Sequence, residues 1–152
     1  MVGLNLVVNP GGYVKDKSQQ AVSARDPAAL NVKVMVIDDS KTIRRSAETL
    51  LRKAGCEVIT AVDGFEALAK ITVNKPDIIF VDIMMPRLDG YQTCALIKNN
   101  QSFKSTPVIM LSSKDSIFDR ARGRIVGSEK YLTKPFSKED LINAITAYVG
   151  QG

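Results

Sequence analysis

Five short apolar runs, each followed by a segment with helical periodicity, constrain the fold of this chain more than any other feature. The runs are continuously apolar over most of their length, and each ends in polar residues. They cover the ranges 32–37, 57–61, 77–81, 107–111 and 129–132. Strands buried on both faces have this pattern, which is typical of a parallel sheet with helices on both sides. We therefore predict a doubly wound α/β fold with five strands and five helices.

Helix signals fill the segments between the runs. In the first segment Ile43, Ala47, Leu50, Leu51 and Ala54 recur at helical spacing and stop at Gly55, a favourable C-cap. The other helices are indicated by Ala67, Leu68 and Ile71 after Gly64, by Cys94 and Ile97, by the range 116–126, and by Leu141, Ile142, Ile145 and Val149. The stretch Ser137-Lys138-Glu139-Asp140 fits a capping box at the start of the last helix.

The first thirty residues differ from the rest in composition and in hydrophobic periodicity. They contain Asn9-Pro10-Gly11-Gly12 and a polar stretch over 15–20, and no period of 2 or 3.6 is sustained there. We predict an N-terminal extension over residues 1–30, weakly structured or docked, and one globular domain over residues 31–150.

Composition excludes several classes of protein. The chain has no histidine, which excludes imidazole catalysis and His-ligated zinc, and Cys56 and Cys94 are too far apart for CxxC chemistry. The N-terminus lacks the basic and apolar regions of a secretory signal, and no apolar run approaches membrane-spanning length. We expect a cytoplasmic protein with two reduced cysteines and no membrane insertion. Although the formal net charge is +5, the cluster Arg120, Arg122 and Arg124 is interleaved with acidic residues, so we expect no nucleic-acid binding.

Polar groups follow four of the predicted strands. Asp38 and Asp39 follow the first, Asp82 the third, Ser112 the fourth and Lys134 the fifth. Ligands of such sheets bind outside the carboxyl ends of the strands. Each group alone is an ordinary cap or turn residue, but together they predict one site.

The predicted site suits a hard cation and a phosphoryl group. Three carboxylates close together repel one another unless a cation compensates, and an all-oxygen ligand set favours Mg²⁺. Lys134 and Ser112 could then bind phosphoryl oxygens. Asp82 ends the central buried strand and is the carboxylate best placed to be phosphorylated.

Five motifs resemble the receiver domain of two-component response regulators. They are Val36-Ile37-Asp38-Asp39-Ser40, Val81-Asp82-Ile83-Met84-Met85-Pro86, Asp89-Gly90, Leu111-Ser112-Ser113 and Tyr131-Leu132-Thr133-Lys134-Pro135-Phe136. The resemblance covers about residues 32–149 and implies a flavodoxin-like sheet with strand order 2-1-3-4-5. The stretches 33–53 and 80–100 are most similar to PilG-type regulators, stand-alone receivers of the chemotaxis-like system that governs type IV pili and twitching motility.

The resemblance also implies a role for each site residue. It makes Asp82 the phosphoacceptor, and it implies a Mg²⁺ site formed by Asp39 directly, Asp38 through water, Asp82 and the backbone carbonyl of Met84. It assigns Ser112 and Lys134 to the phosphoryl group, a cis peptide bond to Pro135, and a switching aromatic ring to Tyr131.

The function implied is a phosphorylation-controlled binding module. It would accept a phosphoryl group from a histidine kinase or phosphotransfer domain and later hydrolyse it, with no other enzymatic activity. Its output would be a protein contact on the face of the fourth helix, fifth strand and fifth helix. Two alternatives stay open: a phosphohydrolase, which usually has a second Asp where Met84 stands, and a phosphorylation-independent scaffold. Only three residues follow Val149, so we expect no DNA-binding effector domain.

Overall fold

The structure, a computed structural model, describes residues 30–113 and 118–149. Strands and helices alternate strictly along the chain. The strands are β1 (Lys33–Ile37), β2 (Glu57–Ala61), β3 (Ile78–Asp82), β4 (Val108–Ser112) and β5 (Lys130–Thr133). The helices are α1 (Lys41–Lys53), α2 (Gly64–Asn74), α3 (Gly90–Lys98), α4 (Arg120–Val126) and α5 (Lys138–Tyr148).

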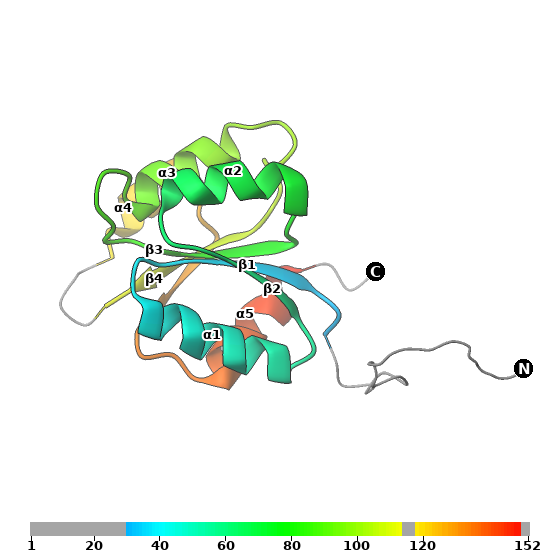
Figure 1. Ribbon diagram of the computed structural model, residues 1–152. Helices are drawn as coiled ribbons and strands as arrows, with labels where there is room; N and C mark the ends of the chain where they lie inside the picture. The colour runs from blue at the N-terminus through cyan, green and yellow to red at the C-terminus, as the bar shows by residue number, and fades with distance from the viewer. Residues whose placement is uncertain (1–29, 114–117, 150–152) are drawn as a thin grey trace, which may run out of the picture.

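The five strands form one parallel sheet in the order β2-β1-β3-β4-β5, as predicted. Helices α1 and α5 cover one face of the sheet, while α2, α3 and α4 lie on the other (Figure 1). The strand order reverses next to β1, which pairs with both β2 and β3. Because all strands run the same way, their carboxyl ends meet at a single edge.

Alternate residues of each strand supply two separate cores. On β1, Val34 and Val36 belong to the core beneath α1 and α5, whereas Met35 and Ile37 belong to the core beneath α2 and α3. Both cores contain fully buried side chains from β3 and β4 as well. This double burial explains why the strands are continuously apolar.

Several predicted strand boundaries are wrong by one residue, and the predicted start of the fourth helix, at 116, lies outside the described residues. Strand β3 is one residue later than predicted, since Asp82 itself pairs with Leu111 in the sheet ladder. Strands β4 and β5 are displaced in the same direction. Helix α4 begins at Arg120 because the side chain of Asp119 caps it, accepting a hydrogen bond from the backbone N–H of Arg122.

The capping box at α5 is confirmed, with Ser137 and Asp140 each bonding the other's backbone N–H. Both cysteines are buried and free, Cys56 in one core and Cys94 in the other. The predicted extension lies outside the described residues except for its last position, Leu30.

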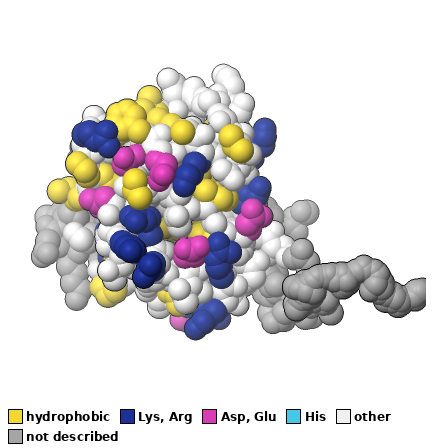
Figure 2. Space-filling view, in the orientation of Figure 1, with side chains coloured by type: hydrophobic (Ala, Val, Ile, Leu, Met, Phe, Trp, Pro, Cys, Tyr) yellow, Lys and Arg dark blue, Asp and Glu magenta, His cyan; other side chains and the backbone are white. Residues whose placement is uncertain are grey.

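Charged and apolar side chains are mixed on the face that Figure 2 draws. Lys and Arg side chains are interspersed with acidic ones over α1, and hydrophobic side chains lie among charged ones over α2 and α3. Exposed Phe65, Val73 and Leu96 belong to these last two helices. No helix in the described part of the chain is long and apolar enough to span a membrane.

Candidate functional site

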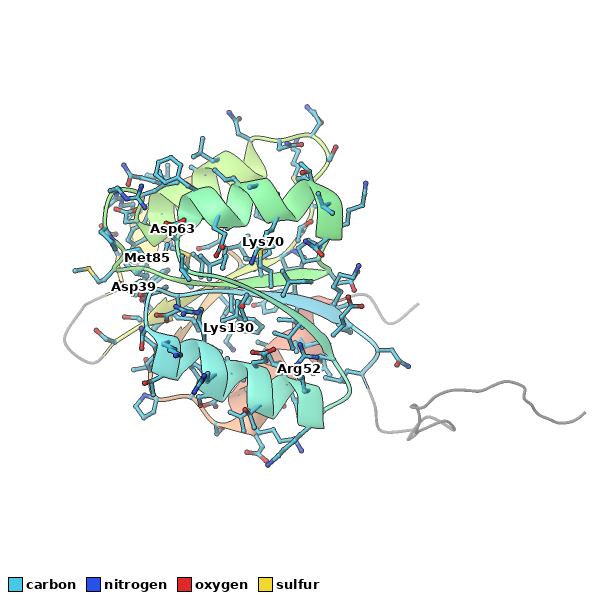
Figure 3. All side chains as sticks on the ribbon, viewed as in Figure 1. Asp39, Arg52, Asp63, Lys70, Met85 and Lys130 are labelled. Carbon is cyan, nitrogen blue, oxygen red and sulfur yellow. The ribbon has the colours of Figure 1, made fainter. Side chains whose placement is uncertain are left out.

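The carboxyl edge of the sheet gathers the acidic residues that the sequence singled out. Asp38 and Asp39 lie between β1 and α1, and Asp82 is the last residue of β3. Asp39 lies at this edge, at the same end of the molecule as Met85 (Figure 3). Asp38 is completely buried and Asp82 nearly so, whereas Asp39 is exposed.

Asp38 is fixed by the start of α1. Its Oδ1 accepts a hydrogen bond of 2.9 Å from the backbone N–H of Ser40, the N-cap residue of the helix. The guanidinium of Arg44 donates to the backbone carbonyl of Asp38 at 2.7 Å. The Arg44 contact was missed in the sequence analysis, although its position one turn after the cap was a usable signal.

Lys134 joins the two buried carboxylates. Its Nζ lies 3.2 Å from Oδ2 of Asp38 and 3.0 Å from Oδ1 of Asp82. Its backbone N–H donates to the carbonyl of Ser112 at 2.7 Å, and the Lys134–Pro135 peptide bond is cis. The lysine therefore reaches the acidic cluster from the loop after β5.

Burial and mutual repulsion disturb the ionisation of this cluster. Burial, followed by the charge of Asp38, raises the pKa of Asp82 to about 6, against the opposing effect of Lys134. Burial likewise raises the pKa of Asp38. The pKa of Lys134 is lowered by burial but raised more by the two carboxylates, and the net shift is upward.

The three carboxylates fit a hard divalent cation. One oxygen from each of Asp38, Asp39 and Asp82 can be chosen so that all three lie within 4.8 Å of one another. An all-oxygen set with an excess of negative charge suits Mg²⁺. Met84 lies in the loop after β3, two residues beyond Asp82, and its side chain is exposed.

The start of helix α3 lies very close to the backbone of Asp82. A Cβ on Gly90, the first residue of α3, would lie 2.5 Å from the carbonyl oxygen of Asp82 and 2.8 Å from the Cα of Ile83. The N–H of Gly90 donates to the carbonyl of Ile83 at 2.9 Å. Only glycine allows α3 to begin this close to the strand, which gives the Asp89-Gly90 motif a steric reason.

Ser112 is the last residue of β4, whereas Tyr131 lies within β5. Ser112 is buried at the end of β4, and its hydroxyl contacts the carbonyl of Ser113 at 3.3 Å. Tyr131 lies half-buried on β5, where its ring stacks on Phe118 at 4.3 Å between centroids and its hydroxyl accepts a bond from Arg120. Hydrogen bonds thus join Asp38, Asp82 and Lys134 in one cluster, while the contacts of Tyr131 are with Phe118 and the start of α4.

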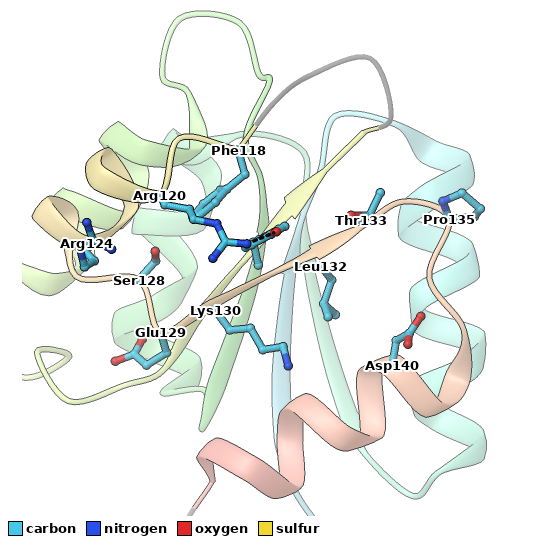
Figure 4. A pocket seen from close by; sticks show the side chains of 11 residues that line it. Phe118, Arg120, Arg124, Ser128, Glu129, Lys130, Leu132, Thr133, Pro135 and Asp140 are labelled. Carbon is cyan, nitrogen blue, oxygen red and sulfur yellow. Dashed lines mark hydrogen bonds between the residues drawn. The ribbon is translucent and has the colours of Figure 1, made fainter.

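A groove lies alongside β5. This groove, of about 700 Å³, runs between α4, β5 and α5 (Figure 4). Its lining includes Phe118, Arg120 and Tyr131 together with Arg124, Lys130 and the acidic residues Glu129 and Asp140. We refer to it below as the β5 groove.

Comparison with known proteins agrees with this fold. Residues 34–146 match the response regulator receiver domain family, and the chain belongs to that family. It is 79% identical over 118 residues to the protein PilG of Pseudomonas aeruginosa, covering 78% of this chain and 87% of PilG. This similarity confirms a PilG-type receiver.

The chain is also similar to more distant regulatory and chemotaxis proteins. The chain is 39% identical over 112 residues to the transcriptional regulatory protein PhoP of Bacillus subtilis, covering 74% of this chain but only 46% of PhoP. Among solved structures, the chemotaxis protein CheY4 of Vibrio cholerae aligns with a TM-score of 0.74 and 35% identity, covering 78% of this chain and 99% of CheY4. Receiver domains are signalling phosphoacceptors that use Mg²⁺ at an acidic pocket and contact kinases or phosphotransfer domains and downstream proteins.

Proposed function

We propose that this chain acts as a receiver in which Asp82 accepts a phosphoryl group from the phosphohistidine of a histidine kinase or phosphotransfer domain. A carboxylate oxygen of Asp82 attacks phosphorus, the new P–O bond forms as the N–P bond breaks, and the imidazole leaves with the electron pair. In the second half of the cycle a water oxygen attacks phosphorus, phosphate departs and the Asp82 carboxylate is regenerated. The chain would have no other enzymatic activity.

The neighbours of Asp82 would bind the metal ion and the phosphoryl oxygens. Asp39 would bind Mg²⁺ directly, Asp38 through a water, and the backbone carbonyl of Met84 would complete the protein ligands. The ion supplies positive charge against the phosphoryl oxygens when it is bound. Lys134 would donate from Nζ to one phosphoryl oxygen and Ser112 would donate its hydroxyl to another.

One observation carries this proposal. Lys134 Nζ lies 3.0 Å from the Asp82 carboxylate inside a cluster of three carboxylates, at the ligand-binding edge of a doubly wound sheet. An ammonium group held against a buried carboxylate is already placed for the oxygens that phosphorylation would add there.

We infer that the β5 groove is the output surface and that it binds an acidic partner. The two acidic residues in its lining are engaged elsewhere: Glu129 bonds the Val108 N–H and pairs with Lys98, and Asp140 caps α5. Arg124 and Lys130 are exposed in the same lining, so the charge offered to a partner is positive. Reorientation of the Tyr131 side chain upon phosphorylation would alter this surface.

The biological setting follows from similarity. The chain resembles PilG over most of the length of both proteins, which supports a role in a chemotaxis-like system controlling type IV pili and twitching motility. A cytoplasmic location fits that role.

The test is phosphorylation of the purified chain by acetyl phosphate in the presence of Mg²⁺, read by intact mass. We expect one added phosphoryl group on the parent chain, none after Asp82→Asn and none when EDTA replaces Mg²⁺. Glu57→Gln, at the opposite end of the sheet, is the matched control and should be labelled normally. Substantial label on the Asp82→Asn variant would contradict the assigned acceptor.

A further inference from the structure

Helix α4 buries little of its own surface. It has only seven residues, Arg120–Val126, and Gly123 is its only buried residue. Isolated helices of this length are unstable in water, so α4 depends on contacts with the rest of the fold. Its outer face is exposed, with Ile125 84% accessible.

Those contacts form a continuous stack of rings and guanidinium groups. The ring of Phe118 lies between two tyrosine rings, with its centroid 6.1 Å from that of Tyr91 on α3 and 4.3 Å from that of Tyr131 on β5. Arg122 lies over the ring of Tyr91, 4.4 Å from its centroid, and Arg120 lies over that of Tyr131 at 5.5 Å. Ring stacking and cation–π contacts both favour this order. Below, "the aromatic stack" means these five residues.

The stack is also bonded to the first turn of α4 by hydrogen bonds. The hydroxyl of Tyr91 accepts a bond of 2.8 Å from the backbone N–H of Asp119, the N-cap residue. Arg120 donates to the Tyr131 hydroxyl at 3.1 Å, and Arg122 pairs with Asp89 at 3.4 Å. Both ends of the stack, Arg120 and Arg122, are therefore α4 residues bonded to side chains outside this helix, and Figure 4 shows Arg120 beside Phe118.

Gly123 makes room for the central ring. A Cβ at this position would lie 2.4 Å from Cζ of Phe118, and 3.0 Å from the Ser128 hydroxyl. Alanine favours a helix more than glycine does, so the glycine is explained by the ring that packs against it and not by helix stability.

We propose that Phe118 is a positioning residue that couples Tyr131 to α4, so that movement of the Tyr131 ring loosens or shifts the start of this helix. The signalling consequence rests on the proposed function, because phosphorylation of Asp82 would supply the movement. The coupling itself does not, since a change at Tyr131 should reach α4 mainly through this ring, with the Arg120 contacts of Tyr131 as a second, direct link. Phe118, Arg120 and Tyr131 also line the β5 groove, which would change shape with the stack.

The first test uses the unphosphorylated chain and measures amide hydrogen exchange in α4. The N–H of Gly123 bonds the carbonyl of Asp119, and that of Gly127 bonds Gly123, so both report helix opening. We expect Tyr131→Ala to speed exchange at both glycines about tenfold, while Gly90 in α3 stays unchanged. In a Phe118→Ala background, Tyr131→Ala should have a much smaller effect, because only the Arg120 contacts then link Tyr131 to α4. Equal effects of Tyr131→Ala with and without Phe118 would overturn the proposal.

Further variants distinguish the proposed coupling from a general loss of structure. Gly123→Ala should mimic Phe118→Ala in the parent chain because the methyl group displaces the ring, and the two changes should not add when combined. Tyr91→Phe keeps the ring and removes only the bond to Asp119, which separates stacking from hydrogen bonding. Full additivity of Gly123→Ala and Phe118→Ala would contradict the packing argument.

The final arm joins the coupling to signalling. With fluorotyrosine incorporated, ¹⁹F spectra of the Asp82-phosphorylated chain should show shifts at Tyr131 and Tyr91 together, and Phe118→Ala should abolish the Tyr91 shift alone. Label on Asp82, read by intact mass, should be the same in both proteins. Absence of label would count against the proposed function, whereas normal label with an unaltered Tyr91 response in Phe118→Ala would count against the role of Phe118.

Discussion

Lys134 Nζ lies 3.0 Å from Oδ1 of Asp82, although 52 residues separate the two along the chain. The same ammonium contacts Asp38, so one cation serves two buried carboxylates and leaves the cluster with excess negative charge. This imbalance gives the site its chemical character: the acidic residues are held close together at a cost in stability that a bound cation would offset.

Replacing Asp82 with Asn should stabilise the metal-free protein at neutral pH. The pKa of Asp82 is about 6 in the fold, above the value of 3.8 for the free side chain, so the folded state binds more protons between these values. The parent chain should therefore lose about 1 kcal/mol of unfolding free energy from this group as pH rises from about 5 to about 7. Urea unfolding in EDTA at both pH values should show this loss in the parent and not in Asp82→Asn. An identical pH dependence in the two proteins would contradict the raised pKa.

Mg²⁺ should raise the thermal stability of the parent chain, and the acidic residues should differ in their share of this effect. Asp39 is exposed, so Asp39→Asn should leave the metal-free melting temperature almost unchanged while removing most of the stabilisation by Mg²⁺. Asp38→Asn should reduce the Mg²⁺ effect less, because an outer-shell partner contributes about 10–100-fold in affinity. Thermal unfolding across a MgCl₂ titration measures both. Equal losses for the two variants would reverse the assigned order.

Gly90→Ala should destabilise the protein by about 1–3 kcal/mol, as overpacking against fixed atoms does. The added methyl group would meet the backbone of Asp82 and Ile83, which cannot move without displacing the site. Gly64→Ala is the comparison, because the atoms it meets belong to the side chains of Thr93 and Leu88. Chemical denaturation should show the larger loss for Gly90→Ala, and a loss no greater than that of Gly64→Ala would mean that the strand end yields easily.

Cys94 should resist alkylation in the native protein. Burial raises the pKa of its thiol to about 12, so the reactive thiolate is scarce at any pH at which the fold is studied. Burial raises the pKa of Cys56 as well. Iodoacetamide at pH 8 should label neither thiol before denaturant is added and both afterwards, with peptide mass spectrometry locating the label. Rapid native labelling of Cys94 would indicate that α3 opens readily.

Reversing charge in the β5 groove should impair output without affecting phosphorylation. The double variant Arg124→Glu with Lys130→Glu should reduce twitching in a strain that depends on this chain, since an acidic partner would be repelled. Its Asp82 labelling by acetyl phosphate should match the parent. Lys75→Glu with Lys104→Glu, a similar charge change on exposed residues away from the groove, is the control. Normal twitching by the groove variant would place the output contact on another face.

Much of this architecture is encoded locally. The apolar runs around Phe80 and Ile109 are buried on both faces and read as strands without any tertiary information, because double burial removes the polar alternation. The Ser137 capping box and the helix stop near Gly55 are equally local, since they satisfy backbone groups within one turn. Asp82 and Asp38 could be singled out because polar residues directly follow these runs.

Tertiary structure decided everything that depends on distance between segments. The end of β3 depends on the pairing of Asp82 with Leu111, and the start of α4 depends on the Asp119 cap. The apolar pattern of the sequence predicts neither. The sequence placed Tyr131 on a predicted strand, but its partner Phe118 is 13 positions away, outside any local period. The strand order set the 3.0 Å contact between Lys134 and Asp82, and the missing Cβ of Gly123 set the position of the Phe118 ring. A sequence determines which residues must be buried or capped, whereas only close packing determines which of them touch.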